Sequence, residues 1–541
     1  MFTYVNRSHL SEILPTNSLC GPVYAYEIVN RTRASIDHAH RPVPTRPGRS
    51  LSAIMKSVTR MRAVTAAAVV AAASLTAALT GNVSASAAQA PSPASAPAAG
   101  LAITVHPTQT GHALRPGFVG LSFGAATVAA DNYSSTDLAG YLRTLGSTGV
   151  LRIGGNSGDG TFWTSTDEPA PSWATSGTIT PDKLQHLAAI AKSTGWKVIL
   201  AVNLKHRDPA RAADEARSAQ QIFGRSLLAI EVGNEPNFYE TDAAAYYADF
   251  ETYASAIRAA VPGMRLTGPE AETNHSSWLA GFATADAAHP DVDIVSDHTY
   301  PTSACGGQVA TIAQLLGTAS VQYENANAQA ALSAARQLHV PAAMTETNST
   351  VCAGTAGVSD TFASALWSLD YTLMLAQDGI STAEFMDGTN AAGCDPYTPL
   401  CPTTGDLTPR PLYYGMLATS LVGSGDFVAL DNPDSADVRA YAVREGGHLT
   451  VVLDDVQDPA SHAATTVNLN LGLPGLHCGS LTALATTSPD GLAATTDITL
   501  GGQQVGPHGA FAAPQHTPVA VHHGSASVTV QAGSAVIIRF D

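Results

Sequence analysis

Two short segments of the chain place a glutamate at the end of an apolar, strand-like run. Asn234-Glu235-Pro236 follows residues 227–233, and Thr345-Glu346-Thr347-Asn348 follows residues 340–344. Two carboxyl groups held at strand ends are the minimum equipment for cleaving a glycosidic bond. One can act as acid and then base, and the other as nucleophile or base. We therefore predict that Glu235 and Glu346 form a catalytic pair, if the fold brings them together.

The elements that must position this pair begin at about residue 117, where short apolar runs alternate with helical patterns. The eight predicted strands are 117–123, 150–154, 197–203, 227–233, 265–269, 293–298, 341–346 and 382–387. The predicted helices include 180–194, 209–222, 243–260 and 359–378. This alternation indicates a parallel sheet with helical crossovers, and eight such units favour an α/β fold of the (β/α)8 TIM-barrel type over residues 117–423. A doubly wound open sheet is the alternative, but no Gly-rich phosphate loop opens any of the helices.

In such a barrel, functional residues lie at the carboxyl ends of the strands. Glu235 follows the fourth strand and Glu346 lies at the end of the seventh, on opposite sides of the barrel mouth. We expect Asn234 to bind the sugar 2-hydroxyl, Tyr300 after the sixth strand to orient the nucleophile, and Arg152 on the second strand to lower the pKa of Glu346.

Each motif also has a simpler interpretation. Asn-Glu-Pro alone often ends a strand without any function, and Glu-Thr-Asn recurs at residues 272–274, where we interpret it as incidental. For His298, a direct sugar contact and a purely supporting role both remain open, and Arg152 could equally be an ion-pair residue of the barrel. Glu231 and Glu270 are expected to be core-end or rim carboxylates. The catalytic hypothesis depends on the combination of both glutamates with their strand positions.

The sequence pattern changes after about residue 424. Alternating apolar and polar residues appear at 438–443, 448–453, 466–471, 527–530 and 535–540, separated by Gly, Asp and Pro turns. This pattern is typical of an antiparallel β-sandwich, which we assign to residues 424–541. The strand-like segment within residues 101–116, ahead of the barrel, is expected to join it.

The N-terminus has the pattern of an exported protein. Residues 1–54 are expected to be a disordered upstream extension, 55–90 a secretory signal peptide and 91–100 a linker. A disordered leader on a membrane anchor is the alternative. After residue 87 the chain carries 18 Lys and Arg against 41 Asp and Glu. This acidic balance suits a secreted, extracellular protein without a stable membrane anchor, and argues against nucleic acid as a partner.

Export permits disulfides. Cys394 and Cys401 close a short Pro-rich loop, and Cys305 and Cys352 each follow a predicted strand, so we expect these two pairs to be bridged. Cys478 is left over and is expected to be a buried thiol. The cysteine spacings do not resemble a zinc site, and we predict neither a metal nor a cofactor.

Several segments together resemble glycoside hydrolase family 79, the clan A family of β-glucuronidases and heparanase-like enzymes. They are residues 120–123, 151–157, 232–236, 345–349, 357–367 and 411–415. The resemblance covers about residues 101–541. It implies a barrel with a β-sandwich, and a retaining mechanism in which Glu235 is the acid/base and Glu346 the nucleophile.

The chain departs from the family pattern at two places. Uronate-specific members often carry Tyr-Gly-Gly after the nucleophile, where this chain has Val351-Cys352-Ala353-Gly354. The N–H groups of Cys352, Ala353 and Gly354 could still form an anion-binding nest, held by a Cys305–Cys352 bridge. Tyr397 falls where the family places a second tyrosine that contacts the sugar carboxylate. Gly124 replaces an acidic residue, for which Asp159 is expected to compensate.

The sequence thus predicts a secreted retaining exo-β-glycosidase whose partner is a carbohydrate. The leading hypothesis is a β-glucuronidase that releases glucuronic or 4-O-methylglucuronic acid from glycans or glucuronide conjugates. The alternatives are the same machinery acting on a neutral β-glycoside, and a non-catalytic glycan-binding barrel. An endo-acting, heparanase-like role is disfavoured because a sulfated chain requires a basic cleft.

Overall fold

The computed structural model describes residues 100–541, except 134–135, 391–392, 404 and 432–435. The predicted extension and signal peptide lie outside the described residues, as does all but the last residue of the predicted linker. Within the described part of the chain, none of the helices combines the length and the apolar character that crossing a membrane requires.

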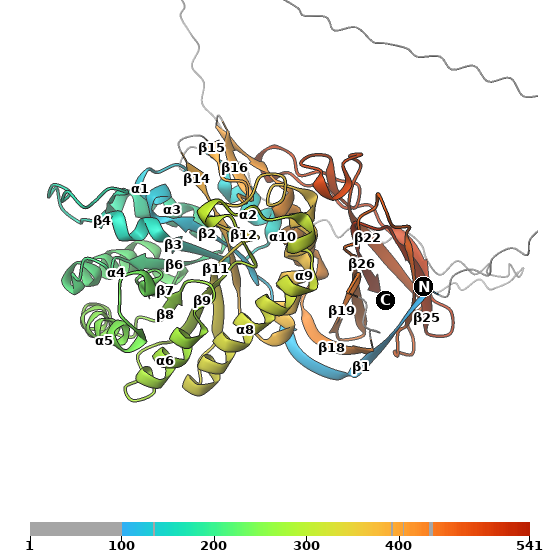
Figure 1. Cartoon of the computed structure of the whole chain (residues 1–541), viewed down its shortest axis with the longest axis horizontal. Helices are drawn as coiled ribbons and strands as arrows, with labels where there is room; N and C mark the ends of the chain where they lie inside the picture. The colour runs from blue at the N-terminus through green and yellow to red at the C-terminus, as the bar shows by residue number, and fades with distance from the viewer. Residues whose placement is uncertain (1–99, 134–135, 391–392, 404, 432–435) are drawn as a thin grey trace, which may run out of the picture. The chain divides into compact units, whose positions relative to one another are not determined.

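Eight parallel strands form a closed barrel (Figure 1). In order around the barrel they are β2 (Val119–Gly124), β3 (Val150–Gly154), β6 (Lys197–Val202), β7 (Leu227–Val232), β8 (Leu266–Ala271), β9 (Ile294–Thr299), β11 (Ala342–Thr347) and β13 (Ala383–Asp387). The last strand pairs with the first, with Ala383 opposite Val119, so the sheet has no open edge. The predicted barrel is confirmed, and the open doubly wound sheet is wrong.

Helices connect the barrel strands. The principal ones are α2 (Leu138–Leu145), α3 (Pro181–Thr194), α4 (Pro209–Phe223), α5 (Ala243–Ala260), α6 (Ser276–Asp286), α8 (Thr318–Leu338), α9 (Phe362–Asp378) and α10 (Pro411–Val422). The start of α4 shows why they form where they do. Pro209 occupies the first helical position, where its missing N–H costs nothing, and the Asp208 side chain accepts a hydrogen bond from the N–H of Arg211.

Short elements lie in the loops at the C-terminal ends of the barrel strands. They are α1 (Ala125–Ala129), α7 (Ile312–Leu315), and the strand pairs β4 (Thr161–Trp163) with β5 (Gly177–Ile179), β10 (Thr302–Ser303) with β12 (Thr350–Val351), β14 (Thr389–Asn390) with β15 (Gly393–Cys394), and β16 (Leu400–Thr403) with β17 (Asp406–Pro409). The sequence did not predict them, because two to five residues are too few to show a helix or strand periodicity.

The remaining strands form a ten-stranded, mostly antiparallel sheet. They are β1 (Leu101–Leu114), β18 (Gly425–Asp431), β19 (Val438–Glu445), β20 (His448–Asp455), β21 (Thr465–Asn470), β22 (Cys478–Thr486), β23 (Ile498–Leu500), β24 (Thr517–Ala520), β25 (Ser525–Val530) and β26 (Ser534–Phe540). Apolar side chains from distant strands, such as Val105, Leu469 and Ile538, share one buried cluster. The sheet therefore encloses its own core, as expected for a sandwich.

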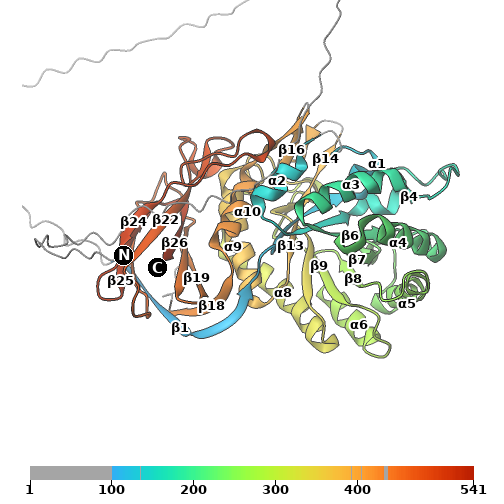
Figure 2. The ribbon, with the colours of Figure 1, turned by 180° about the vertical axis from the view of Figure 1, so that it is seen from behind.

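The N-terminal strand joins this β domain, as predicted (Figure 2). Strand β1 pairs antiparallel with β18 and parallel with β21. The sequence predicted antiparallel pairing throughout, so the β1–β21 pair is a local correction. Its physical reason is that no short hairpin connects the two strands, and only a tight turn forces antiparallel neighbours.

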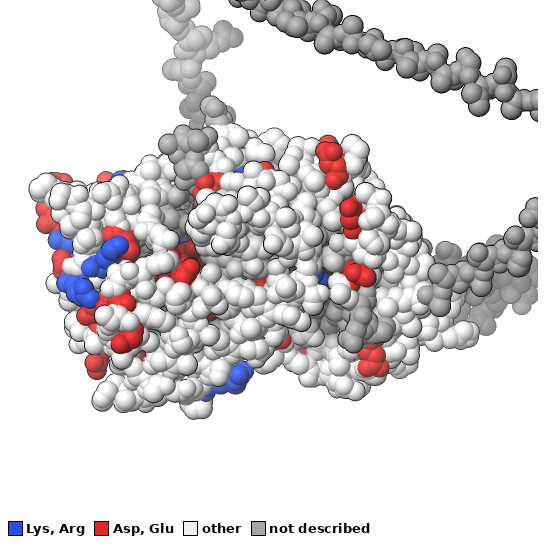
Figure 3. Space-filling model, viewed as in Figure 1, with Lys and Arg blue, Asp and Glu red and all other residues white. Residues whose placement is uncertain are grey.

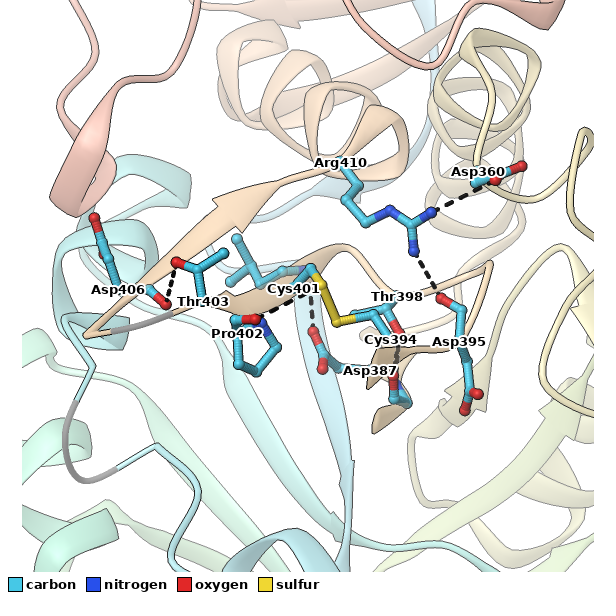
Figure 4. Close-up of a disulfide and its surroundings, with 12 residues drawn as sticks. Asp360, Asp387, Cys394, Asp395, Thr398, Cys401, Pro402, Thr403, Asp406 and Arg410 are labelled. Carbon is cyan, nitrogen blue, oxygen red and sulfur yellow. Dashed lines mark hydrogen bonds and ion pairs between the residues drawn. A yellow bond between two sulfur atoms is a disulfide. The ribbon is translucent and has the colours of Figure 1, made fainter. Parts of the chain in front are cut away.

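Both expected disulfides are present. Cys305 and Cys352 bridge the loops after β9 and β11 with a Cα–Cα distance of 5.3 Å, and Cys394 and Cys401 bridge the ribbons after β13 with 5.7 Å (Figure 4). Cys478 takes part in neither bridge. It lies at the start of β22 and is partly exposed, so the expectation of a buried thiol is wrong.

Candidate active site

Glu235 lies just past the carboxyl end of β7 in an unusual backbone conformation. Its φ is 42°, in the left-handed region, and its N–H donates a hydrogen bond of 2.9 Å to the carbonyl oxygen of Glu270. Non-glycine residues held in this region carry backbone strain, which is common at functional sites. The side chain is only 4% exposed. The chain therefore holds this carboxyl group in a defined position at the barrel mouth.

Glu346 lies at the end of β11, and two donors reach its carboxylate. Arg152 Nη1 donates to Oε2 over 2.6 Å, and the Tyr300 hydroxyl donates to Oε1 over 2.7 Å. Burial alone would raise the pKa of Glu346, but nearby His298, together with Arg152 and Tyr300, lowers it below its ordinary value. Glu346 is therefore ionised at neutral pH.

The two glutamates meet across the barrel mouth. One oxygen of Glu235, one of Glu346 and a ring nitrogen of His298 all lie within 4.8 Å of one another. His298 Nδ1 lies 3.0 Å from Glu235 Oε1. The fold has brought together two residues that are far apart in the sequence, as the strand positions predicted.

Arg152 on β3 is the fully buried centre of an ion-pair network. Its Nε and Nη2 donate to the two carboxylate oxygens of Glu231 over 2.7 and 2.5 Å. Nη2 also donates to Asn234 Oδ1 over 2.7 Å, while Nη1 holds Glu346. The two interpretations of Arg152 are thus compatible, because the same guanidinium is a barrel ion-pair residue and a partner of Glu346.

Replacing Arg152 with methionine should destabilise the protein strongly. Removing one member of a buried ion pair leaves the other charge without compensation, here Glu231 as well as Glu346, which costs about 3–5 kcal/mol. Thermal and denaturant unfolding would measure the loss. Arg217→Met is the matched control, since the Arg217 side chain is 49% exposed and its pair with Asp214 should contribute less than about 1 kcal/mol. Equal stability of the two variants would contradict the network.

His298 is held between two carboxylates. Its Nδ1 faces Glu235 and its Nε2 lies 3.3 Å from Glu270 Oε2. Burial opposes its protonation most strongly, but Glu346, Glu235 and Glu270 together raise its pKa well above the ordinary value. An imidazolium at this point donates to Glu235 and fixes its orientation. The geometry therefore favours the supporting role for His298 over a direct sugar contact.

Asn234 and Asp159 lie on the Glu235 side of the site. Asn234 Nδ2 donates to Asn156 Oδ1 over 2.9 Å. Asp159 forms a salt bridge of 3.2 Å with Lys205, and its charge interacts with that of Glu235. No hydrogen bond from Asp159 to either glutamate is present among the described residues. Its expected role as a replacement for an acidic residue at Gly124 stays a prediction.

The loop after β11 lies beside Tyr397. Cys352, Ala353 and Gly354 have successive φ values of 64°, 71° and 84°. None of the described residues accepts a hydrogen bond from their N–H groups. A Cβ on Gly354 would lie 2.8 Å from the Tyr397 nitrogen, so only glycine allows this approach.

Tyr397 in turn faces Tyr300, with ring centroids 6.5 Å apart. Its loop is braced by the nearby disulfide and by Arg410, which donates to the Asp395 carbonyl oxygen over 2.8 Å and lies 3.6 Å from Asp360 (Figure 4). The predicted Tyr397 and nest residues are therefore neighbours of one another, on the Tyr300 side of Glu346.

The sequence missed several residues that hold this site. Glu270 and Glu231 are fully buried, which agrees with the core-end alternative and not with the rim, but their pairing with His298 and Arg152 was not predicted. The second Glu-Thr-Asn copy is also not incidental to the geometry, because Thr273 Oγ1 accepts a hydrogen bond of 3.3 Å from the N–H of Tyr300. Its position after the fifth strand of a barrel was the available signal, since every such loop reaches the mouth.

Among the described residues, Glu235, His298 and Glu346 also form a set of donors close enough to hold a metal ion. Arg152 and a protonated His298 already supply positive charge to the carboxylates, which disfavours a further cation at this point. The donor set is better described as two carboxyl groups held by separate hydrogen bonds, Glu235 to His298 and Glu346 to Arg152 and Tyr300, than as a metal centre.

Among known protein families, a match is found for the C-terminal β domain. Residues 440–537 match the model of the glycosyl hydrolase family 79 C-terminal beta domain. No match is found among curated proteins. The resemblance drawn from the sequence motifs is therefore confirmed by the match of the β domain.

Solved structures share the whole architecture. A 4-O-α-L-rhamnosyl-β-D-glucuronidase from Fusarium oxysporum 12S is 22% identical with a TM-score of 0.66, over 81% of this chain and 100% of its own. The family 51 α-L-arabinofuranosidase AbfB from Bifidobacterium longum is 15% identical with a TM-score of 0.61, over 82% of this chain and 100% of its own. At these identities the likeness shows the fold, a barrel with an attached β domain.

Proposed function

We propose that this chain, whose C-terminal β domain matches the family 79 model, is a retaining exo-β-glucuronidase. The observation that carries the proposal is that one carboxyl oxygen of Glu235 and one of Glu346 lie within 4.8 Å of each other at the mouth of a glycosidase-type barrel. Retaining glycosidases hold their two carboxyl groups about 5–5.5 Å apart, whereas inverting ones need about 6.5–9.5 Å to admit a water molecule. The short separation supports attack by a carboxylate on the sugar.

In the proposed reaction, ionised Glu346 attacks the anomeric carbon while Glu235 protonates the leaving oxygen. This step breaks the glycosidic bond and forms an ester between Glu346 and the sugar. Glu235, now a carboxylate, removes a proton from water, which attacks the anomeric carbon and releases the sugar and Glu346. Asn234 is proposed to bind the sugar 2-hydroxyl.

The glucuronate specificity is proposed from the groups beside Tyr300. The N–H groups of Cys352, Ala353 and Gly354 are not used by the described residues, and successive N–H groups in a turn favour an anion. The Cys305–Cys352 bridge holds the start of this loop, and the backbone nitrogen and Cβ of Tyr397 lie beside Gly354. These groups are proposed to replace the missing tyrosine of the Tyr-Gly-Gly pattern.

An exo-acting enzyme on a mostly neutral glycan fits the surface better than one on a sulfated chain. On the face drawn in Figure 3, Lys and Arg side chains are few and scattered among uncharged and acidic ones. The two disulfides support the proposed secretion, because disulfides persist in oxidising compartments.

The test of specificity is hydrolysis of 4-nitrophenyl β-D-glucuronide beside the β-glucoside, β-galactoside and β-xyloside, with Glu346→Gln as the blank. The proposal expects the glucuronide to be cleaved fastest and the variant to be inactive. Cleavage of a neutral glycoside instead would mean that the enzyme is a glycosidase for another sugar and not a glucuronidase. Equal, undetectable turnover by both proteins would favour a glycan-binding barrel without catalysis.

Tyr300→Phe tests whether the Tyr300 hydroxyl orients Glu346, in a variant whose fold should be unchanged. The tyrosine hydroxyl donates to Glu346 and lowers its pKa, so its removal should raise that pKa. Because the nucleophile must be ionised, the acidic limb of kcat/KM should move to higher pH, and kcat should fall about 10- to 100-fold. Tyr247→Phe is the control, since the Tyr247 hydroxyl donates to the His289 carbonyl oxygen and not to the site. An unchanged acidic limb in Tyr300→Phe would contradict this role.

A further inference from the structure

A cavity lies beside the loops that follow β3 and β6. Its volume is about 320 Å³, which falls within the range of about 300–1,000 Å³ typical of small-molecule sites. Neither Glu235 nor Glu346 lines it. Three segments contribute its walls: residues 161–173, the loop after β6, and the first two turns of α4. The cavity is therefore distinct from the catalytic pair, although both lie among the loops at the same end of the barrel.

One wall of the cavity is a preassembled aromatic surface. The rings of Trp173 and His206 stack with centroids 3.7 Å apart and an interplanar angle of 15°. Phe162 packs edge-on against Trp173 at 5.8 Å, and the Arg211 guanidinium lies 4.4 Å from the Phe162 ring. Trp173 is partly exposed. His206 covers one face of the indole, so the other face is the one on which the C–H groups of a pyranose ring would stack, favoured by the negative quadrupole of the ring.

The lining also includes the carboxyl group of Glu215. Glu215 is 4% exposed and lines the cavity, and none of the described residues forms a hydrogen bond with its carboxyl group. Its carboxyl oxygens are not among the fully buried atoms that lack a partner, so they reach the cavity and can bind water or a ligand there. Burial, reinforced by Asp214 and opposed by Arg211, raises the pKa of Glu215 to about 8. At neutral pH it can donate one hydrogen bond and accept others, which matches a hydroxyl group.

The charges around the cavity exclude an anion. Arg211 is the basic side chain of the lining, and it is already engaged by Glu168 at 2.5 Å and Asp208 at 3.1 Å. Glu168 and Asp208 themselves line the cavity. A uronate would therefore meet carboxylates with no available cation, whereas a neutral sugar would meet acceptors and a stacking surface.

The cavity is linked to the proposed cleavage site by residues 158–159. Asn203 Nδ2 donates to the carbonyl oxygens of Gly158 and Asp159 over 2.9 and 3.1 Å. His206 Nε2 lies 3.1 Å from the Asp159 carbonyl oxygen. At the start of the same segment, Asn156 Oδ1 accepts a hydrogen bond of 2.9 Å from Asn234, the neighbour of Glu235, so the cavity lies on the acid/base side. That is the side on which the leaving group departs.

We propose that this cavity binds a neutral pyranose residue of the glycan from which the terminal β-linked uronate is removed. Trp173 stacks on the ring, and Glu215 and Asp208 bind its hydroxyl groups. The assignment to a leaving-group glycan rests on the proposed glucuronidase function. The proposal that the cavity binds a neutral sugar does not rest on that function, because it depends on the residues of the cavity alone.

Binding tests the cavity by itself. The full-length Glu346→Gln protein is titrated with xylobiose, β-1,6-galactobiose and glucuronic acid, followed by calorimetry and tryptophan fluorescence. At least one neutral disaccharide should bind, and Trp173→Ala and Glu215→Ala should each weaken that binding about tenfold. Glu251→Ala, an exposed glutamate on α5, is the control and should bind like the parent protein. Binding of neither disaccharide, or binding that both cavity variants leave unchanged, would overturn the proposal, as would binding of glucuronic acid that they abolish.

Kinetics test the link to cleavage. In the otherwise unaltered enzyme, Trp173→Ala should lower kcat/KM about tenfold for a disaccharide carrying a terminal glucuronate on galactose or xylose, and should leave 4-nitrophenyl β-D-glucuronide unchanged. A Trp173→Phe variant, which keeps an aromatic face, should recover part of the loss. Equal losses on both substrates would overturn the leaving-group assignment. Absence of aryl glucuronide hydrolysis in the parent enzyme would instead refute the proposed function, while the binding result would still stand.

Discussion

Glu346→Gln should lower kcat/KM for 4-nitrophenyl β-D-glucuronide by at least about 10⁴-fold. An amide cannot form the glycosyl ester on which the proposed retaining reaction depends. Glutamine has nearly the same shape, and its amide oxygen can still accept a hydrogen bond from Arg152, so the fold should survive. Initial rates together with thermal unfolding would separate lost chemistry from lost structure.

The chain itself supplies a matched control for this substitution. Glu272→Gln alters the other Glu-Thr-Asn segment, whose carboxylate pairs with His275 at 3.1 Å and not with Arg152 or Tyr300. It should cost less than about tenfold in kcat/KM, the effect of one modest electrostatic change. Comparable losses in the two variants would mean that the nucleophile has been assigned to the wrong copy.

Glu235→Gln should produce a loss that depends on the leaving group. General acid catalysis increases the rate by about 10²–10⁴-fold. A sugar or alkyl alcohol is a poor leaving group and depends on the whole of this increase. A 2,4-dinitrophenolate leaves without protonation. The kcat/KM for 2,4-dinitrophenyl β-D-glucuronide should therefore fall by less than about tenfold. The measurement is kcat/KM for both kinds of β-glucuronide, because this parameter reports the first displacement. A uniform loss on both substrates would assign Glu235 a role other than the acid.

The positions of Glu235 and Glu346 could be predicted because they depend on short-range rules. The repetition of an apolar run followed by a helix shows how many strands precede each motif. That order places Glu235 after β7 and Glu346 on β11, at one end of the barrel. The same rules give both disulfide partners as loop residues. These inferences need no knowledge of which strands are neighbours across the mouth.

The support of the pair could be predicted only in part. The contacts of Arg152 and Tyr300 with Glu346 were expected, but the contact of Arg152 with Glu231 was not, because it depends on the closed barrel turning both side chains inward. Glu270 holds His298 and accepts hydrogen bonds from Ser296 and Thr345, contacts that depend on register between neighbouring strands. Likewise, nothing in the sequence near β1 determines that it pairs in parallel with β21. Such contacts are properties of the assembled sheet, and a single sequence does not reveal them.

The stereochemistry of hydrolysis tests the central claim most directly. Cleavage of 4-nitrophenyl β-D-glucuronide would be followed by proton NMR from the first minutes, before the released sugar equilibrates between its anomers. The short separation of Glu235 and Glu346 predicts that β-glucuronic acid appears first and the α-anomer only later, by mutarotation. If the α-anomer appeared first, the reaction would be a single displacement by water, and Glu346 could not be the nucleophile.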